Sequence, residues 1–343
     1  MVDLSEPQQV IALAHSYFEA HAYRHAYEVL SEALVHSPND PALLRELARA
    51  EVCLEQWVPG AVHAHAALTQ DPHDTQAMRI YALALDGLNR RAEAIWMAWR
   101  TVVAAPNEYL SHYTYGRLLY RAGHRHQALA VVDEALRLQP NDPDTWALRG
   151  AILRALNRIV DSDSAYEQAL RIQPDHATSI NDMALNRLRQ GRLSTALRGF
   201  LGAANIDPTI GTLTRTNVAV TLTTALRRIS WAATAVGLFV AAVGIPADGH
   251  QSPITARVFA AVAGLVFLAF FVMALRLVPA RLWRVALKMK PFLALRVAHA
   301  AFTVVGAAIA TALAGPNGLV AFVGVAIVLG GLFMAFVGRF DYT

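Results

Sequence analysis

Histidine is the residue type in this chain most suited to chemistry, because it binds metals and transfers protons near neutral pH. The chain contains 13 histidines. Close pairs occur at His21/His25, His63/His65 and His124/His126. No acidic or thiol partner stands at metal-ligand spacing from them. We therefore expect no metal site and interpret these histidines as solvated surface residues.

Other catalytic patterns are missing from the sequence. Cys53 is the only cysteine, so neither an intrachain disulfide nor a thiolate zinc cage can form. It falls inside an expected helix, where we expect it to be buried. The sequence contains no glycine loop for phosphate, no Gly-x-Ser-x-Gly and no His-Glu-x-x-His. We expect a protein that is not an enzyme and that needs no cofactor.

Six prolines divide the first part of the chain into units of equal length. They stand 34 residues apart, at Pro38, Pro72, Pro106, Pro140, Pro174 and Pro208. Small residues precede each proline at fixed distances, for example Ala48 and Gly60 before Pro72. Small side chains let helices approach closely, and a proline ends a helix. The constant period predicts a stack of helix pairs.

This pattern resembles the tetratricopeptide repeat (TPR) family over roughly residues 7–208. The resemblance implies an all-α TPR superhelix, with about six helix-turn-helix repeats in 1–208. We expect a capping helix and linker at 209–228, ending at Arg227 and Arg228. The resemblance also implies that the first helix of each pair lines an inner groove with positions 2, 5, 9, 12 and 13 of the repeat.

Arginines and tyrosines occupy many of the implied groove positions. The predicted partner-binding residues are Arg45, Arg49, Arg79, Tyr113, Arg117, Tyr120, Arg121 and Arg154. Guanidinium groups bind carboxylates through two parallel hydrogen bonds, and tyrosine rings add flat contact area. The groove is therefore predicted to bind an acidic peptide or protein tail. A second interpretation stays open: these arginines pair with acidic residues of the same chain, namely Glu46, Glu51, Asp86 and Asp144, and bind no partner.

The composition changes near residue 228. Beyond it, eight Lys and Arg residues face only Asp248 and Asp341, so the high pI of about 9.4 belongs to this part and does not indicate a nucleic-acid partner. Four apolar runs follow, at about 229–247, 255–278, 297–314 and 319–338. Each is about long enough to cross a bilayer. We expect residues 229–343 to form a four-helix transmembrane bundle.

The basic residues favour one orientation for this bundle. Arg227 and Arg228 precede the first run, and the segment 280–296 between the second and third runs is basic. Positive residues favour the cytoplasmic side of a membrane. The N-terminus also has no basic flank and apolar core of a signal peptide. We expect a multi-pass protein of the cytoplasmic membrane, with both termini and the repeats in the cytoplasm.

The segment 280–296 mixes basic and apolar residues. Its predicted lipid-interface residues are Arg281, Trp283, Arg284, Lys288 and Lys290. Such a stretch suits the headgroup layer, where cations meet anionic lipid. The alternative is that these residues only follow the topology rule and bind no particular lipid.

Two functions are consistent with this sequence. The first is a bacterial membrane-tethered scaffold whose groove recruits a protein partner to the cytoplasmic membrane face. The second is a subunit of a membrane transport or envelope-assembly complex, in which the four spans do the work and the repeats regulate them. Small residues at regular spacing in the apolar runs leave homo-oligomers or larger membrane complexes open.

Overall fold

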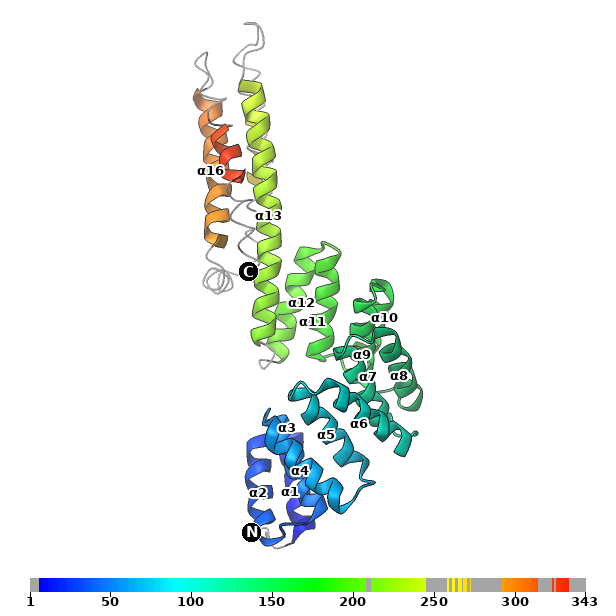
Figure 1. Ribbon diagram of the computed structural model, residues 1–343. Coiled ribbons are helices and arrows are strands. Elements are labelled where there is room, and N and C mark those ends of the chain that lie inside the picture. The colour runs from blue at the N-terminus through cyan, green and yellow to red at the C-terminus, as the bar shows by residue number, and fades with distance from the viewer. Residues whose placement is uncertain are drawn as a thin grey trace. The chain divides into compact units, whose positions relative to one another are not determined.

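The computed structural model describes residues 6–207, 211–244 and 292–313, with further positions between 258 and 272 and between 323 and 332 (Figure 1). The elements with assigned bounds are all helices. They are α1 (Pro7–Glu19), α2 (Tyr23–His36), α3 (Pro41–Cys53), α4 (Trp57–Gln70), α5 (Thr75–Gly87), α6 (Arg91–Ala104), α7 (Tyr109–Arg121), α8 (Arg125–Leu138), α9 (Pro143–Ala155), α10 (Ile159–Ile172), α11 (Ala177–Arg189), α12 (Leu193–Ile206), α13 (Gly211–Gly244) and α16 (Phe292–Leu313).

The helix bounds repeat with the period of the prolines. The first helices of the pairs have 13 residues and the second helices have 14. Successive first helices begin 34 residues apart, at Pro7, Pro41, Thr75, Tyr109, Pro143 and Ala177. The predicted array of about twelve repeat helices is confirmed.

Acidic residues begin several of the first helices. Asp40, Asp74 and Asp142 are the N-caps of α3, α5 and α9, and each accepts a backbone N–H bond at 2.8–2.9 Å. Glu108 precedes α7 and accepts a bond from the Ser111 hydroxyl at 2.9 Å. An N-cap satisfies a backbone donor that has no partner within the helix, and it contributes about 1 kcal/mol. The period therefore sets an acid at the start of each of four consecutive repeats.

The turn inside each pair places a left-handed residue at one repeat position. These residues are His21, Glu55, Asn89, Gly123, Asn157 and Gly191, with φ between 54° and 89°. Glycine adopts this conformation without steric cost and asparagine tolerates it. The glycines and asparagines at this position therefore fit the backbone that the repeat requires.

A glycine and a tyrosine share the space between α9 and α10. A methyl group added to Gly150 would lie 2.6 Å from the Tyr166 ring, which is fully buried. In the second repeat the same two positions hold Ala48 and Ala64, both fully buried. The large Tyr166 side chain on α10 fits because Gly150 on α9 has no side chain.

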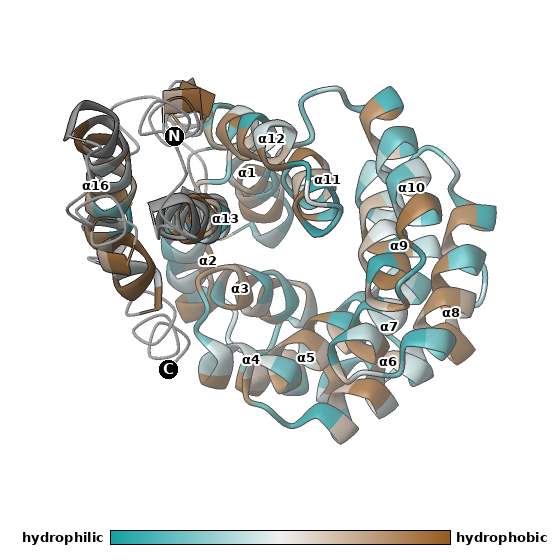
Figure 2. Ribbon diagram, turned by 90° about the horizontal axis from the view of Figure 1, so that it is seen from above, coloured by the Kyte–Doolittle hydropathy of each residue, from teal (hydrophilic) through white to brown (hydrophobic). Residues whose placement is uncertain are grey.

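The chain divides into two compact units, Met1–Ser179 and Ile180–Thr343. In the first unit, α3, α5, α7 and α9 follow one another along a curved row (Figure 2). Contacts join α1 to α3, α3 to α5, α5 to α7, and α7 to α9. The second helices fill the spaces between them; α4, for example, packs on both α3 and α5. The first helices consequently present adjoining surfaces.

In the second unit, α12 packs on α13, and α13 packs on α16. Phe200, Leu226 and Ala300 belong to their shared apolar core. The predicted end of the capping helix at Arg227 and Arg228 is not observed, because α13 continues through both residues. Arg228 instead donates a hydrogen bond to the carbonyl of Gly191 at 3.3 Å.

The predicted four-helix transmembrane bundle is wrong. Across the residues that the structure describes, no helix combines the length and the apolar character needed to cross a membrane. The predicted multi-pass location in the cytoplasmic membrane is overturned by the same finding. Polar side chains are buried on the helices that contain the first and third runs: Thr234 on α13, and Arg296 and His299 on α16. The runs 255–278 and 319–338 lie for the greater part outside the described residues.

Candidate functional site

The predicted partner-binding residues lie on four first helices of the first unit. Arg45 and Arg49 are on α3, Arg79 is on α5, Tyr113, Arg117, Tyr120 and Arg121 are on α7, and Arg154 is on α9. They occupy positions 5, 9, 12 and 13 of their repeats, at spacings that fall on one side of a helix. We call the surface that these eight residues contribute the first-helix face.

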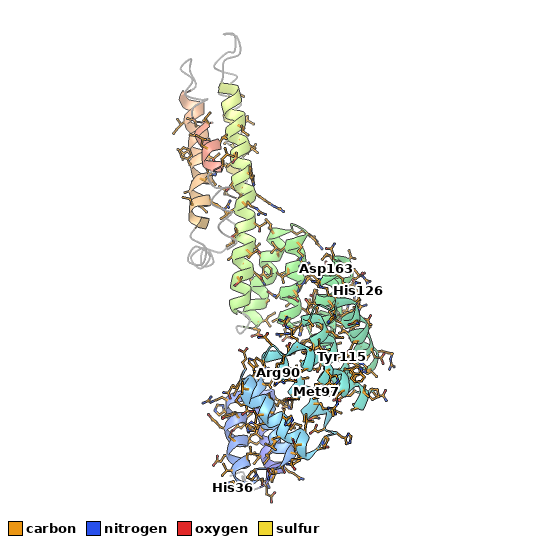
Figure 3. The ribbon with its side chains drawn as sticks, viewed as in Figure 1. His36, Arg90, Met97, Tyr115, His126 and Asp163 are labelled. Carbon is orange, nitrogen blue, oxygen red and sulfur yellow. The ribbon has the colours of Figure 1, made fainter. Side chains whose placement is uncertain are left out.

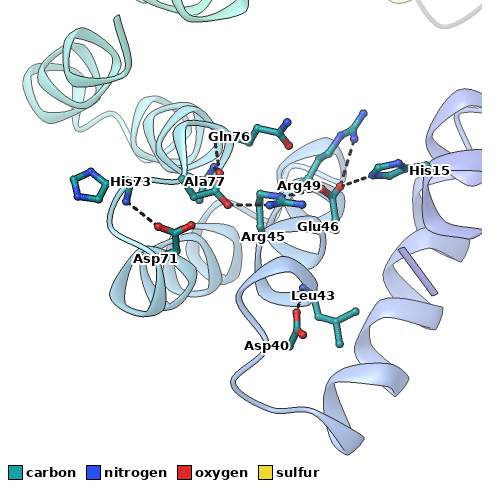
Figure 4. Close-up of polar contacts among 11 residues, drawn as sticks. His15, Asp40, Leu43, Arg45, Glu46, Arg49, Asp71, His73, Gln76 and Ala77 are labelled. Carbon is teal, nitrogen blue, oxygen red and sulfur yellow. Dashed lines mark hydrogen bonds and ion pairs between the residues drawn. The ribbon is translucent and has the colours of Figure 1, made fainter. Parts of the chain in front are cut away.

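The Glu46 carboxylate lies beneath this face and is only 1% exposed. Arg45 Nε approaches it at 3.0 Å, and Arg49 Nη1 and His15 Nε2 each approach it at 3.4 Å (Figure 4). A buried carboxylate loses its hydration and requires cationic hydrogen-bond donors in exchange. Arg45 and Arg49 therefore neutralise an acid of their own chain.

Arg45 and Arg79 also connect neighbouring repeats. Arg45 Nη1 lies 2.9 Å from Oδ2 of Asp74, the N-cap of α5. Arg79 makes the equivalent ion pair with Glu108, at the start of α7. Both arginine side chains are mostly buried, with 21% and 15% exposed. For these two arginines the structure favours pairing within the chain over binding of a partner.

Arg49 and Arg121 are more exposed, although each also contacts an acid. The Arg49 side chain is 44% exposed and lies over the Phe18 ring at 4.1 Å. The Arg121 side chain is 56% exposed, and its Nε lies 2.9 Å from Oδ2 of the buried Asp86. These contacts fix the position of each guanidinium while much of it faces solvent.

The remaining predicted residues are half-buried. The Tyr113 hydroxyl is hydrogen-bonded to Arg117, and burial raises the pKa of Tyr113. Tyr120 packs against the core between α7, α8 and α9. Arg154 is half-buried and engaged in side-chain interactions. The face thus combines exposed guanidinium groups with partly covered aromatic rings.

His63 and His176 each have an acidic partner. His63 Nδ1 lies 2.7 Å from the buried Glu51, and this hydrogen bond raises the pKa of His63. His176 lies 3.1 Å from Asp144, and the bond lowers the pKa of that carboxyl. In the described part of the chain, no three or more His, Cys, Asp or Glu side chains are grouped so that they could hold a metal ion. The expectation of a buried Cys53 is wrong, because its side chain is exposed at the end of α3.

The predicted lipid-interface residues, Arg281, Trp283, Arg284, Lys288 and Lys290, lie outside the described residues.

Residues 110–152 match the family model described as tetratricopeptide repeat. This stretch contains α7 and α8 and the start of α9, and the other helix pairs share its period. The matched stretch is similar to a tetratricopeptide repeat. The remainder of this part of the chain extends the same repeat in both directions.

Known proteins resemble parts of this array of helix pairs. The chain is 32% identical over 83 residues to the TPR repeat-containing thioredoxin TTL4 of Arabidopsis thaliana. It is 28% identical over 102 residues to the protein O-mannosyl-transferase TMTC2 of Homo sapiens. These matches cover 24% and 29% of the chain but only 12% of each relative's length. A solved structure of PilF from Pseudomonas aeruginosa is 18% identical, with a TM-score of 0.47, covering 59% of this chain and 91% of that one.

The sequence did not predict that Asp74 pairs with Arg45 or that Glu108 pairs with Arg79. Asp74 and Glu108 each stand 29 residues beyond their arginine, one residue before a first helix. Their signal was available, because acids recur with the 34-residue period at this place. An acid at the start of a helix is interpreted as an N-cap. The contact with an arginine of the preceding repeat arises only when the repeats stack.

Proposed function

We propose that this TPR array is a protein-interaction module that binds a carboxylate-bearing segment of a partner protein on the first-helix face. The observation that carries the proposal is the state of Arg49 and Arg121. Each guanidinium is fixed by a buried acid of the chain, Glu46 or Asp86, and each side chain is about half exposed.

An arginine held in this way can bind a second carboxylate. A guanidinium carries five N–H donors in a planar fork. The ion pair of Arg121 with Asp86 uses Nε, and that of Arg49 with Glu46 uses Nη1. The other donors can bind a ligand, and a side chain already fixed in place loses less entropy on binding. The partly exposed rings of Tyr113 and Tyr120, on the same helix as Arg121, add apolar contact area.

Arg45 and Arg79 have a different role in this proposal. Their guanidinium groups are mostly buried between repeats and bonded to Asp74 and Glu108. They stabilise the stacking of α3, α5 and α7 and leave little surface for a ligand. Recognition therefore rests on the exposed arginines and the tyrosines of the face.

A phage-displayed library of random peptides, selected on the immobilised full chain, tests this proposal. We expect enriched peptides to contain Asp or Glu and to bind the Arg49→Gln, Arg121→Gln double variant about tenfold more weakly or worse, since each charged hydrogen bond contributes about 1.5–3 kcal/mol. The matched control is Arg91→Gln, Arg171→Gln, two exposed arginines on the second helices α6 and α10. Enriched peptides without acids, or equal binding by the double variant, would reject the proposal.

A further inference from the structure

A cavity of about 200 Å³ lies between α4, α5 and α6 in the first unit. Its inner lining includes Met78 and Met97, which are 3% and 6% exposed; Met97, on α6, is labelled in Figure 3. Thr69 on α4 and Arg100 on α6 lie nearer the surface. Small-molecule sites usually measure about 300–1,000 Å³. This cavity is therefore suited to one large side chain and not to a whole cofactor.

Methionines suit the inner end of a peptide pocket. Their side chains are flexible and polarizable, so they adapt to apolar groups of different shape. Met78 and Met97 belong to the core cluster of α5 and α6, and Leu68 of α4 packs against that cluster. An apolar side chain entering the cavity would continue this core. The cavity thus offers a ligand the same burial that a core residue obtains.

Arg100 brings an uncompensated charge to the cavity. Its guanidinium lies over the Trp96 ring at 5.0 Å. Among residues 6–207, which the structure describes without a gap, no carboxylate forms an ion pair with it. In this it differs from Arg45, Arg79 and Arg121, which all contact acids of the chain. A ligand carboxylate would supply the missing partner.

Three large apolar side chains are exposed on α6 near Arg100. Trp96, Trp99 and Val103 are 53%, 48% and 60% exposed. Their spacing of three and seven residues places them along one side of the helix. Exposed tryptophans beside an arginine are typical of the few residues that dominate binding energy at interfaces. The charged cavity and the apolar strip adjoin through Arg100 and Trp96.

We propose that the cavity, Arg100 and Trp96 form a docking site for a protein segment that carries a large apolar residue next to an acidic one. The apolar side chain occupies the methionine-lined cavity, and the neighbouring carboxylate binds the Arg100 guanidinium. The rest of the segment runs over Trp96. The site is separate from the first-helix face: it opens between the second helices α4 and α6, and its ligand needs neither Arg49 nor Arg121.

The test uses the full chain carrying Arg49→Gln and Arg121→Gln, so that the first-helix face does not contribute. A phage-displayed random peptide library is selected on this protein and counter-selected on the same protein with Thr69→Trp. Thr69 is exposed at the cavity, so a tryptophan there fills it without altering the core. Dissociation constants of the enriched peptides are then measured by fluorescence anisotropy. Far-UV circular dichroism melts establish that every variant is folded.

We expect enriched peptides to share a Leu, Met or Phe adjacent to Asp or Glu. Arg100→Gln and Thr69→Trp should each weaken their binding by about tenfold or more, and so should an Asp→Asn or Glu→Gln change in the peptide. Arg91→Gln, an exposed arginine at the start of the same helix, should leave binding unchanged. The proposal is overturned if no peptide is enriched, or if the enriched peptides bind the Arg100→Gln variant as tightly as its parent.

Discussion

Replacing Arg45 by methionine should destabilise the repeat array by about 2 kcal/mol. Methionine keeps the apolar stem and removes the guanidinium, which bonds Asp74 at 2.9 Å and Glu46 at 3.0 Å. A hydrogen bond to a charged group contributes about 1.5–3 kcal/mol. We take a value near the lower end of this range because Arg45 is 21% exposed and Glu46 keeps longer contacts with Arg49 and His15. The Glu46 carboxylate is otherwise buried, so it cannot regain its hydration.

A double-mutant cycle with Asp74→Asn isolates the bond between repeats. Asparagine caps a helix about as well as aspartate, so the N-cap of α5 is retained while the charge is removed. We expect a coupling energy of about 1 kcal/mol between the two changes. Unfolding of the full chain in urea, followed by far-UV circular dichroism, gives the four free energies of unfolding.

Arg137→Met is the matched control for this cycle. Arg137 and Glu134 also form an ion pair, at 2.7 Å, but both side chains are exposed and lie on one helix. Exposed pairs of this kind contribute little to stability, because water and salt screen them. If Arg45→Met costs no more than Arg137→Met, or if the cycle shows no coupling, Arg45 does not stabilise the stacking of repeats.

Two further predictions concern the packing and the pH dependence of the fold. Gly150→Ala should destabilise the chain by about 1–3 kcal/mol through contact with the Tyr166 ring, and Tyr166→Leu in the same chain should recover part of this loss in urea unfolding. Because Glu51 raises the pKa of His63, their pair stabilises the fold fully below the unfolded-state pKa of about 6.5 and loses this contribution as pH rises through the raised folded-state value. Thermal melts across pH should show this decline, of about 1 kcal/mol, in the wild type and not in His63→Gln; equal profiles would show that the pair does not contribute.

The helix pairs could be predicted from sequence because their signals are local. A proline that follows a helix disfavours its continuation, and a residue such as Ala48 marks a close approach through its size alone. The five equal intervals between the six prolines then place every first helix to within a few residues. The compensation between Gly150 and Tyr166 was not foreseen, since it depends on how two positions 16 residues apart face each other.

The pairing of Arg45 with Asp74 could not be predicted from local sequence signals. The sequence indicated Arg45 as a groove residue and placed Asp74 two residues after Pro72. Their 2.9 Å contact depends on how α5 stacks against α3, which the period alone does not determine. The groove was predicted from the positions of the arginines alone. That prediction did not include the acids of the next repeat, which stacking places against Arg45 and Arg79.

The membrane prediction failed for a related reason. An apolar run indicates that a segment is buried, but it does not identify what covers it. Within the described residues, Ile229 and Ala233 of α13 and Ala300 of α16 pack into one core. The hydroxyls of Thr234 and Thr303 are buried there and donate to carbonyls of their own helices. These partners belong to the tertiary structure, which hydropathy does not contain.

The pairing of the arginines also decides how binding on the first-helix face can be tested. By sequence alone, Arg45, Arg79 and Arg117 are a natural set to replace with alanine, on the expectation that exposed arginines add little to stability. In the structure, Arg45 and Arg79 are mostly buried and join successive repeats, so this variant would lose binding and stacking together. Arg49 and Arg121 are about half exposed, and glutamine in their place keeps a polar side chain while it removes the charge. A loss of peptide binding in that double variant, at an unchanged unfolding midpoint, can be assigned to recognition itself.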